Sequence, residues 1–366
     1  MQGLVPVPEQ LLVFLSTGVP IHLPRVPTPW SPKHYGGDYH ALEPACSVKL
    51  TTLRTKGRSC EPSPWTASTS SPPCETIFPE PRVGDNELLV RVRASSVNPV
   101  DVFIAAGALK EMAEHGFPVT LGRDFAGVVE QVGSEVSRYQ VCDEVFGFLL
   151  HANPTVHDGS WAELIAVPED NFASAKPRKL DFDQAGAAPL AAITALAAFD
   201  ALAPAEGEIV LVVGAAGGVG SFFVQLAASA GSTVIAPALP EDRDYLHGLG
   251  VSELIDRDGD VAAAVREAHP GDVDAILDVA SATPDTSLLR ERGRLASPLD
   301  AAGEGEGRFN IMAEPTPANL QRLAEVLDDG TLRVQIQRSY PLEQAGDALQ
   351  ALPTTHTQGK LGLMIA

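Results

Sequence analysis

The 366-residue sequence has few basic residues and no long apolar segment. Its 26 Lys and Arg stand against 47 Asp and Glu, which gives a net charge of −21. Binding to nucleic-acid phosphates or to an anionic membrane needs surplus cations instead. The longest apolar stretch, residues 11–21, is shorter than the ~20 residues of a membrane span and follows no basic region. We therefore expect no nucleic-acid partner, no membrane partner and a cytoplasmic location.

The sequence also has only four cysteines, and three of them lie in the first 74 residues. This segment holds 12 of the 30 prolines and shows no sustained period of 2 or 3.6 residues. Such a composition predicts a poorly ordered Pro/Ser/Thr-rich extension over residues 1–74. The cysteine spacings match no zinc pattern, and an odd number in a reducing compartment predicts no disulfide framework.

A glycine-rich stretch after residue 208 carries the clearest functional signal. Five apolar residues, Ile209–Val213, predict a buried parallel strand, and the apolar spacing after Ser221 predicts a helix. Glycines between them allow a tight turn and let a phosphate approach the free N–H groups of the helix start. We expect a pyrophosphate site made by Gly214, Ala215, Gly217, Gly218, Val219 and Gly220.

The surrounding pattern favours dinucleotide binding over a purely structural turn. Apolar runs at Thr233–Ala236 and Val273–Val279 give the β-α-β spacing of a doubly wound sheet. NAD enzymes tend to place an acid at the end of the second strand, where this chain has Pro237-Ala-Leu-Pro240. Arg243 is the first cation available for a 2′-phosphate, so we expect NADPH. The alternative is a solvated Arg243 flanked by Glu241, Asp242 and Asp244.

The length exceeds what one hydrophobic core usually serves, which predicts two domains or more. Several short strands precede the glycine-rich stretch, and this order predicts a small β-rich domain first. The expected strands there are Leu88–Ala94, Phe125–Val132, Glu144–Leu150 and Trp161–Val167. A helical pattern over Phe182–Leu202 leads into the nucleotide domain. In the tail we expect a helix at Leu320–Leu327 ended by Gly330, a strand at Leu332–Ile336 and a helix at Tyr340–Leu349.

Six motifs recur in this order in the medium-chain dehydrogenase/reductase superfamily. They are Ser96-Val-Asn-Pro-Val-Asp101, Gly122-Arg-Asp-Phe-Ala-Gly-Val-Val129, Asp143-Glu-Val-Phe-Gly147, Gly159-Ser-Trp-Ala-Glu163, Ile193-Thr-Ala-Leu196 and Gly214-Ala-Ala-Gly-Gly-Val-Gly220. From about residue 76 onward, the chain most resembles the zinc-free quinone oxidoreductase, or zeta-crystallin-like, branch. The resemblance implies an α/β protein with a GroES-like β-rich substrate domain (75–190), a Rossmann-type doubly wound parallel-sheet domain (191–311), and a return to the substrate domain (312–366). It also implies a homodimer.

The resemblance further bears on the site. Zinc-dependent relatives carry Cys, His and Gly-His-Glu where this chain has Asp101-Val102 and Gly122-Arg123-Asp124, so we expect no metal. His151 and His157 are interpreted as loop residues. The resemblance places Asn98 in the cleft beside the nicotinamide, Thr194 against the nicotinamide, and Lys360 near the cofactor. Alternatively, Asn98 is a turn residue before Pro99, and Thr194 is an ordinary helix residue. Arg123 and Asp124 either reach the cleft or serve packing and charge satisfaction, and the second interpretation is favoured.

Without a metal, alcohol oxidation lacks its usual Lewis acid, whereas hydride addition to an activated acceptor needs mainly a positioned cofactor. We therefore expect a zinc-independent NADPH-dependent reductase of a small-molecule quinone or α,β-unsaturated carbonyl. Phe103 stands where many relatives carry Tyr, so water or substrate groups would supply the proton. A non-catalytic NADPH-binding sensor or structural protein remains the alternative. A polyketide-type enoyl reductase is disfavoured, and a short-chain reductase is excluded because no Tyr precedes a Lys by four residues.

Overall fold

The structure is a computed structural model that describes residues 80–107, 119–150 and 159–365. It also describes the backbone of three short strands, which pair in the order β1-β3-β2 (β1 Phe14–Leu15, β2 Ile21–His22, β3 Ser47–Leu50). The predicted poor order of residues 1–74 otherwise falls on residues outside the described part, and so do His151 and His157. Within the described part, no helix is long and apolar enough to cross a bilayer.

The first domain is built on a seven-stranded sheet in the order β15-β16-β4-β5-β6-β8, with β7 pairing β4 as well. Two of these strands come from the end of the chain, β15 (Ile336–Pro341) and β16 (Lys360–Met364). The alternating run expected at Leu88–Ala94 is the central strand β4, and each of the four strands expected before the nucleotide domain is present. Proline at the second position after β4 ends that strand and starts helix α1. The bounds are β4 Glu87–Val97, α1 Pro99–Ala105, β5 Asp124–Val132, β6 Glu144–Phe148, β7 Leu164–Pro168 and β8 Ala173–Ala175.

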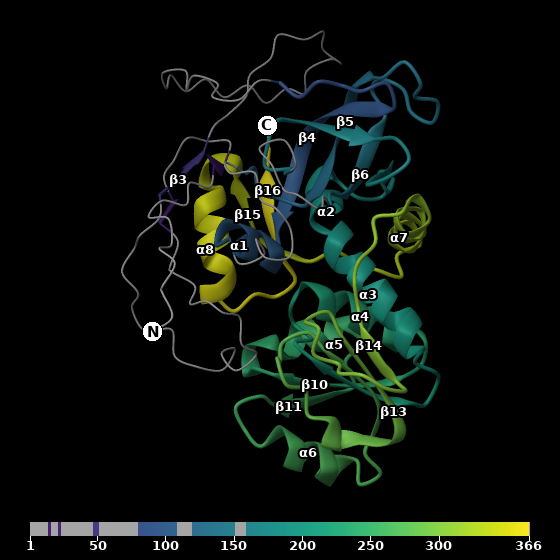
Figure 1. Ribbon diagram of the computed structural model, residues 1–366. Helices are drawn as coiled ribbons and strands as arrows, with labels where there is room; N and C mark the ends of the chain where they lie inside the picture. Colours follow the sequence, from purple (N-terminus) through teal and green to yellow (C-terminus); the bar gives the residue numbers. More distant parts are fainter. Residues whose placement is uncertain are drawn as a thin grey trace, which may run out of the picture.

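The second domain is built on a six-stranded, wholly parallel sheet in the order β11-β10-β9-β12-β13-β14. This confirms the predicted doubly wound sheet, drawn in green in Figure 1. Its strands are β9 Ile209–Val213, β10 Thr233–Ala238, β11 Glu253–Asp256, β12 Val273–Asp278, β13 Leu289–Ser297 and β14 Arg308–Asn310. Its helices include α4 Gly218–Ser229, α5 Arg243–Leu249 and α6 Val261–Ala268.

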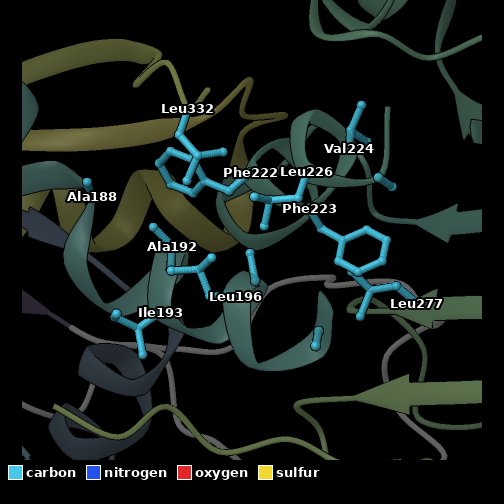
Figure 2. Packing of buried hydrophobic residues seen from close by; sticks show 14 of the residues in the cluster. Ala188, Ala192, Ile193, Leu196, Phe222, Phe223, Val224, Leu226, Leu277 and Leu332 are labelled. Carbon is cyan, nitrogen blue, oxygen red and sulfur yellow. The ribbon is translucent and has the colours of Figure 1, made fainter. Parts of the chain in front are cut away.

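The helical pattern at Phe182–Leu202 forms two helices rather than one, α2 (Phe182–Ala187) and α3 (Pro189–Leu202). Proline is well suited to the first position of α3, where a missing N–H costs no helical bond. Helix α3 packs against α4 in the main core of the nucleotide domain, part of which Figure 2 shows. The labelled members of this cluster are Ala188, Ala192, Ile193, Leu196, Phe222, Phe223, Val224, Leu226, Leu277 and Leu332.

The tail returns to the first domain. Helix α7 (Pro317–Asp329) ends at Gly330 with a φ of +88°, as predicted. Strand β15 (Ile336–Pro341) then pairs with β16 (Lys360–Met364), and β16 lies antiparallel to β4. Figure 1 shows these yellow strands beside the blue strand β4. The last helix, α8, occupies Ala345–Thr354.

Two predictions for the tail were wrong in position. Of the strand expected at Leu332–Ile336, only Ile336 lies in a strand, as the first residue of β15, and Leu332 is instead buried in the core with α4. The Arg333 N–H donates to Gln225 Oε1 at 2.8 Å and its carbonyl accepts from Gln225 Nε2 at 3.1 Å, so a side chain replaces a strand partner. The helix expected from Tyr340 starts only at Ala345, because Tyr340 is still paired in β15.

Candidate active site

The turn after β9 uses its glycines for different purposes. Gly214 has a φ of +86°, which a residue with a side chain rarely adopts. A Cβ on Gly220 would lie 2.2 Å from the Gly214 carbonyl oxygen, so Gly220 allows α4 to pack against the turn. A Cβ on Gly217 would have only the same oxygen nearby, at 3.6 Å. From the sequence, both Gly217 and Gly220 are expected to leave room for a phosphate, whereas in the structure only Gly217 has open space beside it.

These distances predict opposite defects for two alanine substitutions. Gly220→Ala is expected to destabilise the protein by about 1–3 kcal/mol, because the new methyl group overlaps backbone. Gly217→Ala is expected to leave stability within about 0.5 kcal/mol and to weaken binding of the expected dinucleotide, because its methyl group enters the open side of the turn. Urea unfolding and NADPH titration of both variants test the contrast. Equal loss of stability in the two would contradict it.

The C-terminal strand meets this turn. The Gly359 N–H donates to the Ala216 carbonyl at 2.8 Å, and Gly359 forms a bridge with Gly217. Pairing of β16 with β4 sets Leu361 opposite Val97, and so brings Lys360 beside Asn98. Lys360 Nζ lies 2.5 Å from Asn98 Oδ1 and 3.5 Å from Asp124 Oδ2. Its side chain is 4% exposed, and this burial lowers the pKa of the ammonium group.

Asp124 begins β5, which pairs with β4 on the side opposite to β16. Pairing of Ala94 with Ala126 between β4 and β5 puts Asp124 next to Ser96. Asp124 Oδ2 accepts hydrogen bonds from Ser96 Oγ at 2.6 Å and from Asn98 Nδ2 at 2.9 Å. Asp124 Oδ1 accepts from the Leu190 N–H at 2.7 Å. That N–H belongs to the first turn of α3, where helices leave N–H groups unsatisfied and favour negative charge.

Thr194 lies one turn further along α3. Its Oγ1 donates to the Leu190 carbonyl at 2.8 Å, and the residue is buried. The hydroxyl oxygen therefore keeps its lone pairs for a donor outside the helix. Asn98, Thr194 and Lys360, which the sequence analysis selected from distant stretches, thus join through Asp124 and Leu190. For Asp124 the sequence favours charge satisfaction over a place in the cleft, and no motif points to Leu190.

Asn98 and Asp101 form a compact turn at the start of α1. The Asn98 N–H donates to Asp101 Oδ2 at 2.8 Å, and Asp101 Oδ1 accepts from the Gly122 N–H at 3.0 Å. Burial raises the pKa of Asp101 to about 6, although the positive charge of Arg123 acts in the opposite direction. The Asn98 carboxamide is enclosed, with its oxygen bonded to Lys360 and its nitrogen to Asp124.

Replacing Asp101 by Asn is expected to flatten the pH dependence of stability. The folded protein raises the pKa of Asp101 from 3.8 to about 6, so it binds that proton more tightly than the unfolded chain. The resulting stabilisation is fully present below pH ~4 and is lost as the pH rises through ~6, a change of about 3 kcal/mol. Urea unfolding of both proteins between pH 4 and 7 measures it. Parallel curves would contradict the expectation.

The three acidic neighbours of Arg243 differ in their exposure. Arg243 begins α5 and is exposed, as are Glu241 and Asp244. Asp242 is buried instead of solvated, and accepts hydrogen bonds from His356 Nε2 at 2.7 Å and Gln358 Nε2 at 3.0 Å. Burial would raise the pKa of Asp242, but these bonds hold it below its usual value. Asp242 is therefore engaged by the C-terminal segment.

The donor set does not fit a catalytic zinc ion. At the two places where zinc-dependent relatives carry ligands, the side-chain oxygens belong to Asp101 and Asp124, and each carboxylate is bonded to backbone or side-chain donors. Across residues 80–107, 119–150 and 159–365, no three His, Cys, Asp or Glu side chains gather in a way that suits a metal. Phe103 is partly buried in α1 and has no hydroxyl group to contribute.

Two family descriptions match the chain, Alcohol dehydrogenase GroES-like domain over residues 84–177 and Zinc-binding dehydrogenase over residues 249–362. The quinone oxidoreductase of Sus scrofa is 30% identical over 315 residues, which cover 80% of this chain and 91% of that protein. A chloroplastic NADPH-dependent alkenal/one oxidoreductase of Arabidopsis thaliana is 29% identical over 288 residues, covering 77% and 72%. The solved quinone oxidoreductase of Coxiella burnetii superimposes with a TM-score of 0.70 at 29% identity, covering 79% and 93%.

Proposed function

Because the chain belongs to the quinone oxidoreductase branch of the medium-chain dehydrogenase/reductase superfamily, we propose that it is a zinc-independent NADPH-dependent reductase. Its acceptor is a small-molecule quinone or α,β-unsaturated carbonyl. The relatives support an oxidoreductase that uses a nicotinamide cofactor. The observation that carries the proposal of a reductase is the hydrogen-bond network that joins Lys360 at the glycine turn with Asn98, Asp124 and the start of α3.

The glycine turn supports a dinucleotide site. No side chain caps the start of α4, so its first N–H groups can bind a pyrophosphate beside the open face of Gly217. Arg243 would bind a 2′-phosphate, and the buried, hydrogen-bonded Asp242 offers no free carboxylate to a ribose 2′-hydroxyl. These features support NADPH over NADH. The turn residues in the site are Gly214, Ala215, Gly217, Gly218, Val219 and Gly220.

The bound cofactor would supply the hydride, and the protein has the task of orienting both reactants. Thr194 Oγ1 has free lone pairs to accept a hydrogen bond from the nicotinamide carboxamide. Lys360, held by the Asn98 carboxamide oxygen, places positive charge at the junction of the two domains, where charge developing on an acceptor oxygen would be stabilised. Because Phe103 has no hydroxyl group, water or a substrate group supplies the proton.

A non-catalytic NADPH-binding protein is the second candidate. The observation in its favour is the Asn98 carboxamide, whose oxygen and nitrogen are both engaged within the protein and which is 2% exposed. If Asn98 keeps these bonds when NADPH binds, it is closed to substrate. Phe103 adds to the same argument, since it removes a phenolic donor.

Steady-state NADPH oxidation with a panel of ortho-quinones, para-quinones and enones tests the proposal. We expect turnover with at least one class, unchanged by a zinc chelator, and a lower KM for NADPH than for NADH. Tight NADPH binding without turnover on any acceptor would favour the non-catalytic candidate. Loss of activity on chelation, restored by zinc, would contradict metal independence. The cytoplasmic location and the homodimer stay predictions. The described parallel sheet has β11 and β14 as its two edge strands, and edge pairing of two such sheets would form the dimer.

A further inference from the structure

Asp124 connects elements that belong to different domains. It starts β5 in the substrate-domain sheet, yet its Oδ1 accepts from the first turn of α3, which packs in the nucleotide-domain core. Its Oδ2 accepts from Ser96 and Asn98, and Lys360 Nζ lies 3.5 Å away. Its carbonyl oxygen also accepts from Ser95 Oγ at 2.7 Å and Ser160 Oγ at 2.6 Å. The carboxylate is fully buried, and hydrogen bonds to both of its oxygens fix its position.

These bonds join the two halves of the candidate active site. One oxygen holds α3, and Thr194 follows Leu190 by one helical turn on that helix. The other oxygen holds Asn98, which in turn accepts from Lys360 beside the glycine turn. A shift of α3 relative to Lys360 would move Thr194 relative to the turn that binds the cofactor phosphates. Misplacement of reacting groups by ~1 Å costs about 100-fold in rate.

We propose that Asp124 is a positioning residue that sets Thr194 and Lys360 at a defined separation for hydride transfer. This inference rests on the proposed reductase function. Asparagine in its place keeps the volume but removes one acceptor. If the asparagine oxygen accepts from the Leu190 N–H, the asparagine NH2 group faces the donors Ser96 and Asn98. In the flipped arrangement the NH2 group faces the Leu190 N–H. Either way one of the two connections is lost.

Asp274 provides a matched control. It is also a buried carboxylate in a sheet, and its Oδ2 accepts from the Ile209 N–H at 2.8 Å and pairs with Arg290. Ile209 begins β9, so this contact lies at the end of the strand opposite to the glycine turn. Asp274→Asn therefore removes a structural carboxylate from the same protein without touching the site.

The experiment compares Asp124→Asn with Asp274→Asn in the full-length protein. For Asp124→Asn we expect kcat to fall about 10- to 100-fold, while the Kd for NADPH changes less than about threefold because the phosphate site is untouched. With NADPH deuterated at the transferred C4 position, the isotope effect on kcat should rise as hydride transfer becomes rate-limiting. Asp274→Asn should keep the wild-type kcat and isotope effect. Equal kinetics of Asp124→Asn and the wild type would overturn the inference.

Two further measurements keep the test decisive. If Asp124→Asn does not fold, Ser96→Ala removes one donor to Oδ2 and should lower kcat about 3- to 10-fold; an unchanged kcat would overturn the inference. If the wild type reduces no acceptor, the proposed function fails by itself. The inference is then judged from the emission spectrum of bound NADPH, which should change in Asp124→Asn and not in Asp274→Asn. Identical spectra in all three proteins would overturn it.

Discussion

Replacing Lys360 by methionine is expected to lower the free energy of unfolding by about 3–5 kcal/mol, because removing one member of a buried ion pair leaves the other charge uncompensated. Lys360 is 4% exposed and Asp124 is 0% exposed, so water cannot take the place of the lost ammonium group. Asn98 Oδ1 loses its short hydrogen bond as well. Urea unfolding monitored by tryptophan fluorescence measures the loss.

A second lysine in the same domain gives the control. Lys176 Nζ lies 3.2 Å from Glu144 Oε2, and its side chain is 6% exposed, but that of Glu144 is 53% exposed. Water can therefore solvate Glu144 when its partner is removed. Lys176→Met should cost about 1–2 kcal/mol, mostly from its hydrogen bond to the Leu180 carbonyl. Equal losses in the two methionine variants would contradict the ion-pair argument.

The double variant Lys360→Met, Asp124→Asn separates charge from packing. It removes both charges, and neutral replacements of a buried pair are often nearly as stable as the pair itself. We expect it to be more stable than Lys360→Met alone by about 1–3 kcal/mol, a coupling typical of residues in contact. Its activity should remain low, because Asp124 is also needed for position. Strictly additive losses would show that the two charges do not interact.

Local patterns predicted the elements that hold the site, because those elements follow from short stretches of sequence. The apolar run before Gly214, the helical spacing after it and the alternation in Leu88–Ala94 each specify one strand or helix without reference to the rest of the chain. The ordered motifs then identified the fold class. The break at Pro189 and the late start of α8 were missed, because alanine-rich and leucine-rich spacing does not mark where one helix ends.

The contacts within the site could not be predicted in the same way, because they depend on strand register between distant segments. Asn98 and Lys360 are 262 positions apart, and they meet because β16 pairs with β4 in one register. A slip by one residue would turn Lys360 to the other face of the sheet. The burial of Asp242 likewise depends on a distant segment of the chain. Its neighbours in the sequence are exposed, and it is buried by His356 and Gln358 from the end of the chain.

Among substitutions of exposed residues of the site, Arg243→Glu is expected to change the preference between NADPH and NADH by the largest factor. A charge-assisted hydrogen bond to a phosphate contributes about 1.5–3 kcal/mol, and a glutamate at this position adds repulsion of about 1 kcal/mol in a solvated setting. The sum corresponds to about a 10²- to 10³-fold rise in KM for NADPH. NADH has no 2′-phosphate, so its KM should change by a few-fold at most.

Arg292→Glu is the control for this change in net charge. Arg292 is also exposed and lies in β13 of the nucleotide domain, near Leu289, which pairs with the first residue of β12 at the amino end of the sheet. The glycine turn lies at the opposite, carboxyl end of the sheet, so Arg292→Glu should leave the KM values for NADPH and NADH unchanged. Initial rates with NADPH and NADH for both variants measure the effect. An equal rise in the two KM values for Arg243→Glu would mean that Arg243 does not recognise the 2′-phosphate. The proposed preference for NADPH would then need another cation near the end of β10.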